Sequence, residues 1–186
     1  MTISPDLDGR FREAASAAGL VDVAFDVVET PIGALLVAAT DRGVCRIGFD
    51  PEPEREVEIL ARGFGVRVLR APSAVARARR ELAEYFERKR RRFDLPTDLR
   101  VHAPFRRQVL AELARVPYGA TTTYGDLARR AGHPRAARAV GMVMNQNPVP
   151  IVLPCHRIVG ADGRLVGYGG GLERKEALLR LEGVLA

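Results

Sequence analysis

A cysteine followed directly by a histidine is the pair of residues best suited to chemistry in this chain. Cys155 and His156 stand between Pro154 and Arg157, and Cys155 is one of only two cysteines in 186 residues. A free cysteine has a pKa of about 8.5, so little of it is nucleophilic thiolate at neutral pH without a nearby base or positive charge. Because His156 and Arg157 supply both, Cys155 is a candidate nucleophile.

The alternative interpretation of Cys155 is a buried structural cysteine, since this residue type is among the most often buried. The preceding segment favours a reactive site. Pro148, Pro150 and Pro154 fix their own φ and push the residues before them toward extended conformations. The apolar residues 151–153 between them predict a short buried strand or extended core segment. Such a stiff segment would hold Cys155 in one place.

This stretch resembles the active-site signature of a known protein family. The methylated-DNA protein-cysteine methyltransferases, also called O6-alkylguanine-DNA alkyltransferases, have a signature similar to Asn147-Pro148-x-Pro150-x-x-x-Pro154-Cys155-His156-Arg157. The resemblance extends through the C-terminal half, over Tyr118-Gly119, Thr123-Tyr124-Gly125, residues 136–141, Tyr168-Gly169-Gly170-Gly171-Leu172, Lys175 and Leu181-Glu182-Gly183. Relatives often have Phe-Gln-x-x-Val-Trp where this chain has Phe105-Arg106-Arg107-Gln108-Val109-Leu110, and Gly169 replaces a serine of some members.

The resemblance implies an α+β protein of two domains. Residues 1–98 would form a ribonuclease-H-like α/β domain, and residues 99–186 a mostly helical, winged-helix-like alkyltransferase domain with a helix-turn-helix. The residue pattern agrees with a small sheet plus helix in the first half, because alternating apolar runs separated by turn signals predict strands. These predicted strands are 23–28, 34–39 and 44–49, with an amphipathic helix from Ser73 and a second helix at 105–116.

The segment after residue 122 predicts two short helices joined by a turn. Thr123 can cap a helix that ends at Ala131, Gly132 and His133 can turn, and Pro134 suits the first position of the next helix. This pattern is typical of a helix-turn-helix. The second helix would bury a stripe of residues: Ala136, Val140, Val143 and Met144.

Small residues beside that stripe favour either tight helix packing or close approach to a DNA groove. In the family that the chain resembles, the corresponding helix enters the minor groove, and its arginine fills the gap left by an extruded nucleotide. The resemblance therefore implies DNA-binding roles for Arg138, Ala137, Ala139, Gly141 and Tyr124.

The resemblance also implies a mechanism without a cofactor. Cys155 would attack the alkyl carbon of a flipped-out O6-alkylguanine in line, and the resulting thioether would end the protein's activity after one turnover. His156 and Glu182 would form a proton relay. A water would bridge Cys155 and His156, because neighbouring side chains of an extended backbone point apart. Asn147 would brace the site, and Tyr124 would donate a hydrogen bond to the departing purine.

A glycine-rich stretch completes the predicted site. Tyr168 and the three glycines after it lack the Gly-Lys-Ser or Gly-Lys-Thr of a phosphate loop. Glycine lets backbone N–H groups approach a flat base closely. The resemblance implies a substrate pocket made of Met144, Ile158, Tyr168 and Gly169.

Composition limits the partners. The formal net charge is +6, carried mostly by arginine, which favours a polyanion. The basic run Arg88–Arg92 is either a solvated helix end or a DNA contact. Two distant cysteines and three histidines argue against a disulfide scaffold and a zinc site, and the alternating pattern around Cys45 predicts a core position. We expect no metal, no membrane segment and a cytoplasmic protein.

Three classes of function therefore remain open. The first is a DNA repair alkyltransferase for duplex DNA that contains O6-alkylguanine, with O4-alkylthymine as a further candidate substrate. The second is a cysteine hydrolase, which would turn over and leave Cys155 unmodified. The third is a helix-turn-helix regulator, for which Cys155 would be dispensable. A monomer is expected, and cooperative assembly on DNA is an open alternative.

Overall fold

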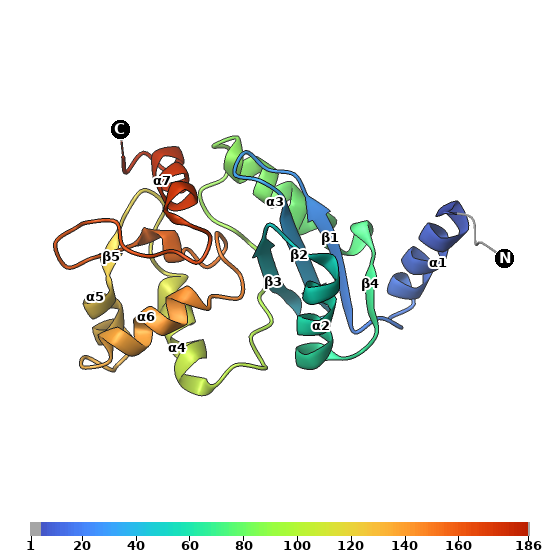
Figure 1. Cartoon of the computed structure of the whole chain (residues 1–186), viewed down its shortest axis with the longest axis horizontal. Coiled ribbons are helices and arrows are strands. Elements are labelled where there is room, and N and C mark those ends of the chain that lie inside the picture. The colour runs from blue at the N-terminus through green and yellow to red at the C-terminus, as the bar shows by residue number, and fades with distance from the viewer. Residues whose placement is uncertain (1–4, 186) are drawn as a thin grey trace. The chain divides into compact units, whose positions relative to one another are not determined.

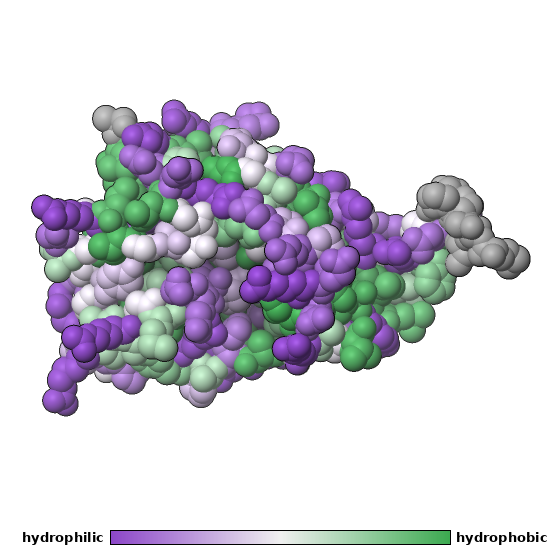
Figure 2. Space-filling model, in the orientation of Figure 1, coloured by the Kyte–Doolittle hydropathy of each residue, from purple (hydrophilic) through white to green (hydrophobic). Residues whose placement is uncertain are grey.

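The structure is a computed structural model that describes residues 5–185. The chain packs into two compact units (Figure 1). The first contains the residues up to Glu84 together with Asp94–Val101, and the second contains Tyr85–Phe93 and the residues from His102 onward. The expected division of the chain after residue 98 stays a prediction. On the face drawn in Figure 2, hydrophilic side chains are interspersed with apolar ones.

The first unit is built on a four-stranded sheet in the order β3-β2-β1-β4. Strands β1 (Val23–Val28), β2 (Leu35–Thr40) and β3 (Gly43–Phe49) are antiparallel neighbours, and β4 (Val68–Arg70) runs parallel to β1. The three antiparallel strands confirm the predicted ones to within one residue at each end. Their alternating apolar residues therefore predicted the sheet correctly.

Four helical segments pack around this sheet (Figure 1). They are α1 (Pro5–Ala17), α2 (Pro53–Phe64), the 3-10 turn η1 (Pro72–Val75) and α3 (Ala76–Phe86). Leu60 of α2 packs with Phe25 and Cys45 in the core, which confirms the predicted core position of Cys45. Asp26, the next residue along β1, faces the other way and pairs with Arg79 of α3 at 3.7 Å.

The segment that contains Pro96 and Asp98, which follows the basic run Arg88–Arg92, lies along β3. Val44 donates its backbone N–H to the carbonyl of Pro96, and Asp98 donates to the carbonyl of Val44, each at 2.9 Å. Gly43 makes this approach possible, because a Cβ there would lie 2.2 Å from the Pro96 oxygen and its φ is +135°.

The second unit is mostly helical. Its helices are α4 (Pro104–Leu113), α5 (Tyr124–Arg130), α6 (Ala137–Asn145) and α7 (Leu172–Leu181), with a 3-10 turn η2 (Cys155–Arg157). A short parallel pair joins β5 (Thr122–Thr123) to β6 (Ile158–Val159). None of the helices in the part of the chain that the structure describes is long and apolar enough to cross a membrane.

The predicted helix-turn-helix is present as α5 and α6. Thr123 caps α5 as expected, since its hydroxyl accepts the backbone N–H of Asp126 at 3.1 Å. Gly132 makes the turn with a φ of +78°. Helix α6 begins at Ala137 rather than at Pro134, because a tight turn closed by the Ala136 N–H on the His133 carbonyl comes first.

The predicted extended conformation of residues 151–153 is wrong. Ile151 is fully buried as expected, but its φ of +74° and the hydrogen bond from the Leu153 N–H to the Val149 carbonyl make this stretch a tight turn. A β-branched residue with positive φ is unfavourable in isolation, so tertiary packing overrides local preference here.

Candidate active site

The tight turn delivers Cys155 to the start of η2, where it is 4% exposed. Its sulfur accepts a hydrogen bond from the Asn147 amide nitrogen at 3.1 Å, and the same nitrogen donates to the Leu153 carbonyl at 2.7 Å. The Asn147 oxygen accepts the N–H of Val149 at 3.1 Å. Asn147 therefore ties both ends of the turn together and to the sulfur.

Burial decides the protonation state of Cys155. Loss of water raises the pKa of the thiol to about 11, although the Asn147 hydrogen bond and the charge of Lys175 oppose the rise. The free protein therefore holds a protonated thiol at neutral pH. A proton acceptor is needed before the sulfur can attack.

His156, the next residue in the chain, is the candidate acceptor. It is fully buried, and its Nε2 lies 2.9 Å from Oε1 of Glu182. Burial lowers the pKa of His156, against the opposing effect of Glu182, so the ring is neutral. A neutral imidazole that donates from Nε2 to a carboxylate has its lone pair on Nδ1, which has no hydrogen-bond partner within residues 5–185.

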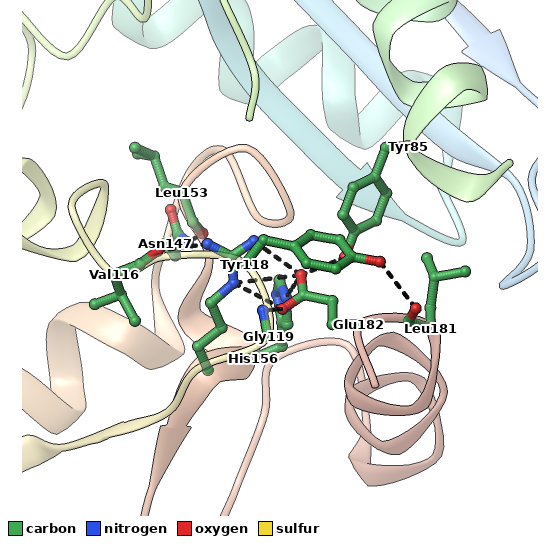
Figure 3. Close-up of polar contacts among 10 residues, drawn as sticks. Tyr85, Val116, Tyr118, Gly119, Asn147, Leu153, His156, Leu181 and Glu182 are labelled. Carbon is green, nitrogen blue, oxygen red and sulfur yellow. Dashed lines mark hydrogen bonds and ion pairs between the residues drawn. The ribbon is translucent and has the colours of Figure 1, made fainter. Parts of the chain in front are cut away.

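Glu182, which follows α7, is surrounded by donors (Figure 3). Arg157 binds it with two nitrogens, from Nη2 to Oε1 at 2.8 Å and from Nε to Oε2 at 2.9 Å. The Tyr85 hydroxyl donates to Oε1 at 2.7 Å, and the Gly119 N–H donates to Oε2 at 3.2 Å. Burial would raise the pKa of Glu182, but the hydrogen bonds from His156 and Arg157 hold it at about 2.

Three residues in or near this site had no correctly predicted role. The sequence suggested that Arg157 supplies positive charge to the thiol, but its guanidinium is directed to Glu182 and to the Val116 carbonyl. Tyr85 lies 97 positions from Glu182, and no local pattern marks that contact. Lys175, recognised only as part of the family pattern, is fully buried, and burial lowers its pKa to about 8.

The predicted DNA-binding residues lie on α6 and at the start of α5. Arg138 is exposed, whereas Ala137, Ala139 and Gly141 are half-buried. Gly141 lies close to the ring of Tyr124, because a Cβ at position 141 would be 3.8 Å from Cε1 of that ring. Burial raises the pKa of Tyr124, and nearby Cys155 adds to the rise, so the phenol is a hydrogen-bond donor.

The predicted pocket residues divide into two groups. Met144 and Ile158 are buried in the core of the second unit. Tyr168 is half-buried, and its pKa is raised by burial and by nearby Cys155. Gly169 is exposed, and a Cβ there would lie 3.1 Å from the Asn145 carbonyl oxygen. The serine of some relatives would therefore crowd this backbone.

Known proteins match both halves of the chain. Two family models of 6-O-methylguanine DNA methyltransferase match this chain. The model of the ribonuclease-like domain matches residues 23–99, and the model of the DNA binding domain matches residues 104–184. A methylated-DNA–protein-cysteine methyltransferase of Mycolicibacterium paratuberculosis is 40% identical over 86% of this chain and 92% of its own. One of Methanosarcina barkeri is 39% identical over 85% of this chain and 96% of its own.

Solved structures are similar over the same length. The O6-methylguanine methyltransferase of Mycobacterium tuberculosis superposes with a TM-score of 0.74 at 36% identity, covering 88% of this chain and 94% of the other. The structure of the same organism's OGT in complex with DNA superposes with a TM-score of 0.75, covering 86% and 92%. The α+β fold predicted from the sequence is confirmed by these matches.

Proposed function

Because this chain belongs to the 6-O-methylguanine DNA methyltransferase family, we propose that Cys155 is the residue that takes the alkyl group from O6-alkylguanine in duplex DNA. The observation that carries this proposal is the buried cluster in which Asn147 contacts the sulfur and Glu182 contacts His156. Every member of the predicted relay lies in the second unit, where the DNA binding domain model matches.

The transfer is an in-line displacement at the alkyl carbon. A sulfur–carbon bond forms on Cys155 as the bond between the carbon and guanine O6 breaks, and the electron pair leaves with the purine. The hydroxyl of Tyr124 donates a hydrogen bond to the purine and reduces the charge that accumulates on it. The proton that Cys155 loses is finally taken up by the purine, which leaves as neutral guanine.

The thiol proton first needs an acceptor. His156 is neutral, and Nδ1 carries its lone pair, so a water between Sγ and Nδ1 can pass the proton to the ring. Glu182 then stabilises the imidazolium through Nε2. Because no group in the site can cleave the thioether, each molecule reacts once.

Base extrusion is required by geometry. A buried sulfur cannot line up behind the alkyl carbon while guanine is stacked in the duplex. Arg138 is exposed on α6 between two half-buried alanines, so it can enter the space that the base leaves. Unstacking costs a few kcal/mol, and an inserted side chain offsets part of it.

The net charge of +6 favours approach to DNA. We propose that a monomer performs this reaction.

The mass of the Cys155 peptide tests this function. After incubation with duplex DNA containing O6-methylguanine, the peptide is expected to gain one methylene, while the Cys45 peptide serves as an internal control. Cys155→Ala is expected to keep lesion binding and lose transfer. An unmodified Cys155 with continued turnover would instead indicate a hydrolase. If Cys155→Ala regulated transcription as well as the wild type does, Cys155 would be dispensable and the protein would be a regulator.

A further inference from the structure

The environment of Glu182 contains more donors than a simple histidine relay requires. Its Oε1 atom is within hydrogen-bond distance of His156, Arg157 and Tyr85, at 2.9, 2.8 and 2.7 Å. Its Oε2 atom accepts from Arg157 at 2.9 Å and from the Gly119 N–H at 3.2 Å. Glu182 therefore shares its single negative charge among a cation, a phenol, a peptide group and an imidazole.

This sharing matters because an imidazole must be neutral before it can accept a proton. A buried carboxylate that contacted only an imidazole would favour the protonated ring. The Arg157 guanidinium already balances the charge of Glu182, and Arg157 is itself only 5% exposed, so water screens the pair little. A second positive charge on His156 is therefore less favourable at rest.

We propose that Arg157 and Tyr85 are positioning residues that hold His156 neutral, with Nδ1 as its only accepting atom, by dividing the charge of Glu182. The inference rests on the proposed function, since it assigns to these two residues the control of the proton acceptor for Cys155.

The atom that would accept the proton supports the proposal independently. Nδ1 of His156 is buried and has no hydrogen-bond partner in the part of the chain that the structure describes. A buried polar atom left without a partner is costly and marks a site of function or of an ordered water. Since Nε2 is committed to Glu182, Nδ1 is the atom left to receive the thiol proton.

The other charged and titratable groups near His156 raise or lower its pKa. Arg157 on η2 and Lys175 on α7 lower the pKa of His156, whereas Glu182 raises it. Cys155 on η2 is protonated at rest, since burial raises its pKa to about 11. Tyr118 lies close by, but its hydroxyl donates to the Leu181 carbonyl at 2.9 Å and not to Glu182 (Figure 3).

Tyr118 therefore offers a matched control for Tyr85. Tyr85→Phe removes a donor from Glu182 and keeps the ring, which packs at 6.1 Å between centroids against Tyr118. Tyr118→Phe also removes one phenolic hydroxyl, but from a backbone carbonyl. Without the Tyr85 donor, Glu182 has more charge available for the imidazole, so the pKa of His156 rises.

The experiment measures single-turnover transfer from an O6-methylguanine duplex as a function of pH. For Tyr85→Phe, the acid limb is expected to move up by roughly 0.5–1 pH unit, the equivalent of one hydrogen bond, with the alkaline plateau unchanged. Tyr118→Phe is expected to follow the wild type. Arg157→Met is expected to shift the limb further than Arg157→Lys, which keeps the charge. Thermal melting confirms that each variant is folded.

A titration of the His156 ring by NMR in the free protein gives a readout that does not depend on transfer. If the wild type methylates Cys155 but the Tyr85→Phe and Tyr118→Phe profiles coincide, the inference fails and the proposed function stands. A loss of rate by the same factor at every pH would also overturn it, because that result indicates a structural role. If the wild type transfers nothing, the proposed function fails, and the NMR titration still decides the inference.

Discussion

Asn147→Asp is the substitution that most directly tests how the site controls its thiol. The change keeps the shape of the side chain but replaces the nitrogen that donates to Sγ at 3.1 Å and to the Leu153 carbonyl at 2.7 Å. The thiolate then loses a hydrogen bond and gains a like charge beside it. Both effects raise the pKa of Cys155 above its value of about 11.

The magnitude follows from the type of bond. A hydrogen bond to a charged group contributes about 1.5–3 kcal/mol, which corresponds to roughly one to two pKa units. If transfer requires the thiolate, the single-turnover rate at fixed pH is expected to fall by about 10- to 100-fold. The assay is rapid-quench transfer from an O6-methylguanine duplex at saturating DNA, so that weaker binding does not contribute.

Asn145→Asp is the matched control for this substitution. Asn145 is exposed at the end of α6 and makes no side-chain hydrogen bond to the sulfur in the described structure. Its substitution by Asp makes the same change of charge two positions away. Its transfer rate at saturating DNA is expected to stay close to that of the wild type. An Asn147→Asp rate within twofold of the wild type, or an equal loss in both variants, would show that the Asn147 hydrogen bond does not control the thiol.

Three further predictions concern stability and DNA binding. The pKa of Glu182 is lowered to about 2 in the folded protein, so its contribution to stability is full above the ordinary carboxyl pKa and is lost as pH falls from about 4.5 toward 2. Chemical denaturation across this pH range should show that loss. Glu182→Gln should abolish this pH-dependent part of the stability. Thr123→Ala removes the cap of α5 and should cost about 1 kcal/mol in urea unfolding, whereas Thr123→Ser should cost less. Arg138→Ala should weaken lesion binding and reduce the fluorescence of an extruded base analogue, and unchanged extrusion would exclude an inserted Arg138.

Local patterns predicted the parts of the fold that depend on neighbours in sequence. The alternating apolar runs located three strands, and Thr123 marked the start of α5. The same reasoning failed at Ile151, because a β-branched residue with positive φ is held there by burial and by contacts that a local pattern does not contain. The start of α6 was missed for a similar reason, since Pro134 fits both a helix start and the tight turn that precedes α6.

The site was predicted partly from residue chemistry and partly from the resemblance. Cys155 and His156 were recognised as a candidate nucleophile and its neighbouring base from their types and adjacency, whereas the role of Glu182 came from the family pattern. The structure places His156 and Glu182 in contact. The remaining donors to Glu182 come from distant positions: Tyr85 lies 97 residues away and Gly119 lies 63 residues away. Long-range contacts of this kind leave no periodic signal in the sequence, so the division of charge on Glu182 emerged only from the fold.

The stoichiometry of methyl transfer shows whether Cys155 is a single-use acceptor. Wild-type protein is mixed with a large excess of duplex DNA that carries an isotopically labelled methyl group on guanine O6, and the label on protein is counted after the reaction stops. We expect one methyl group per protein molecule, all of it on Cys155, with no further lesion repaired. More than one repaired lesion per molecule, or label on a residue other than Cys155, would contradict it.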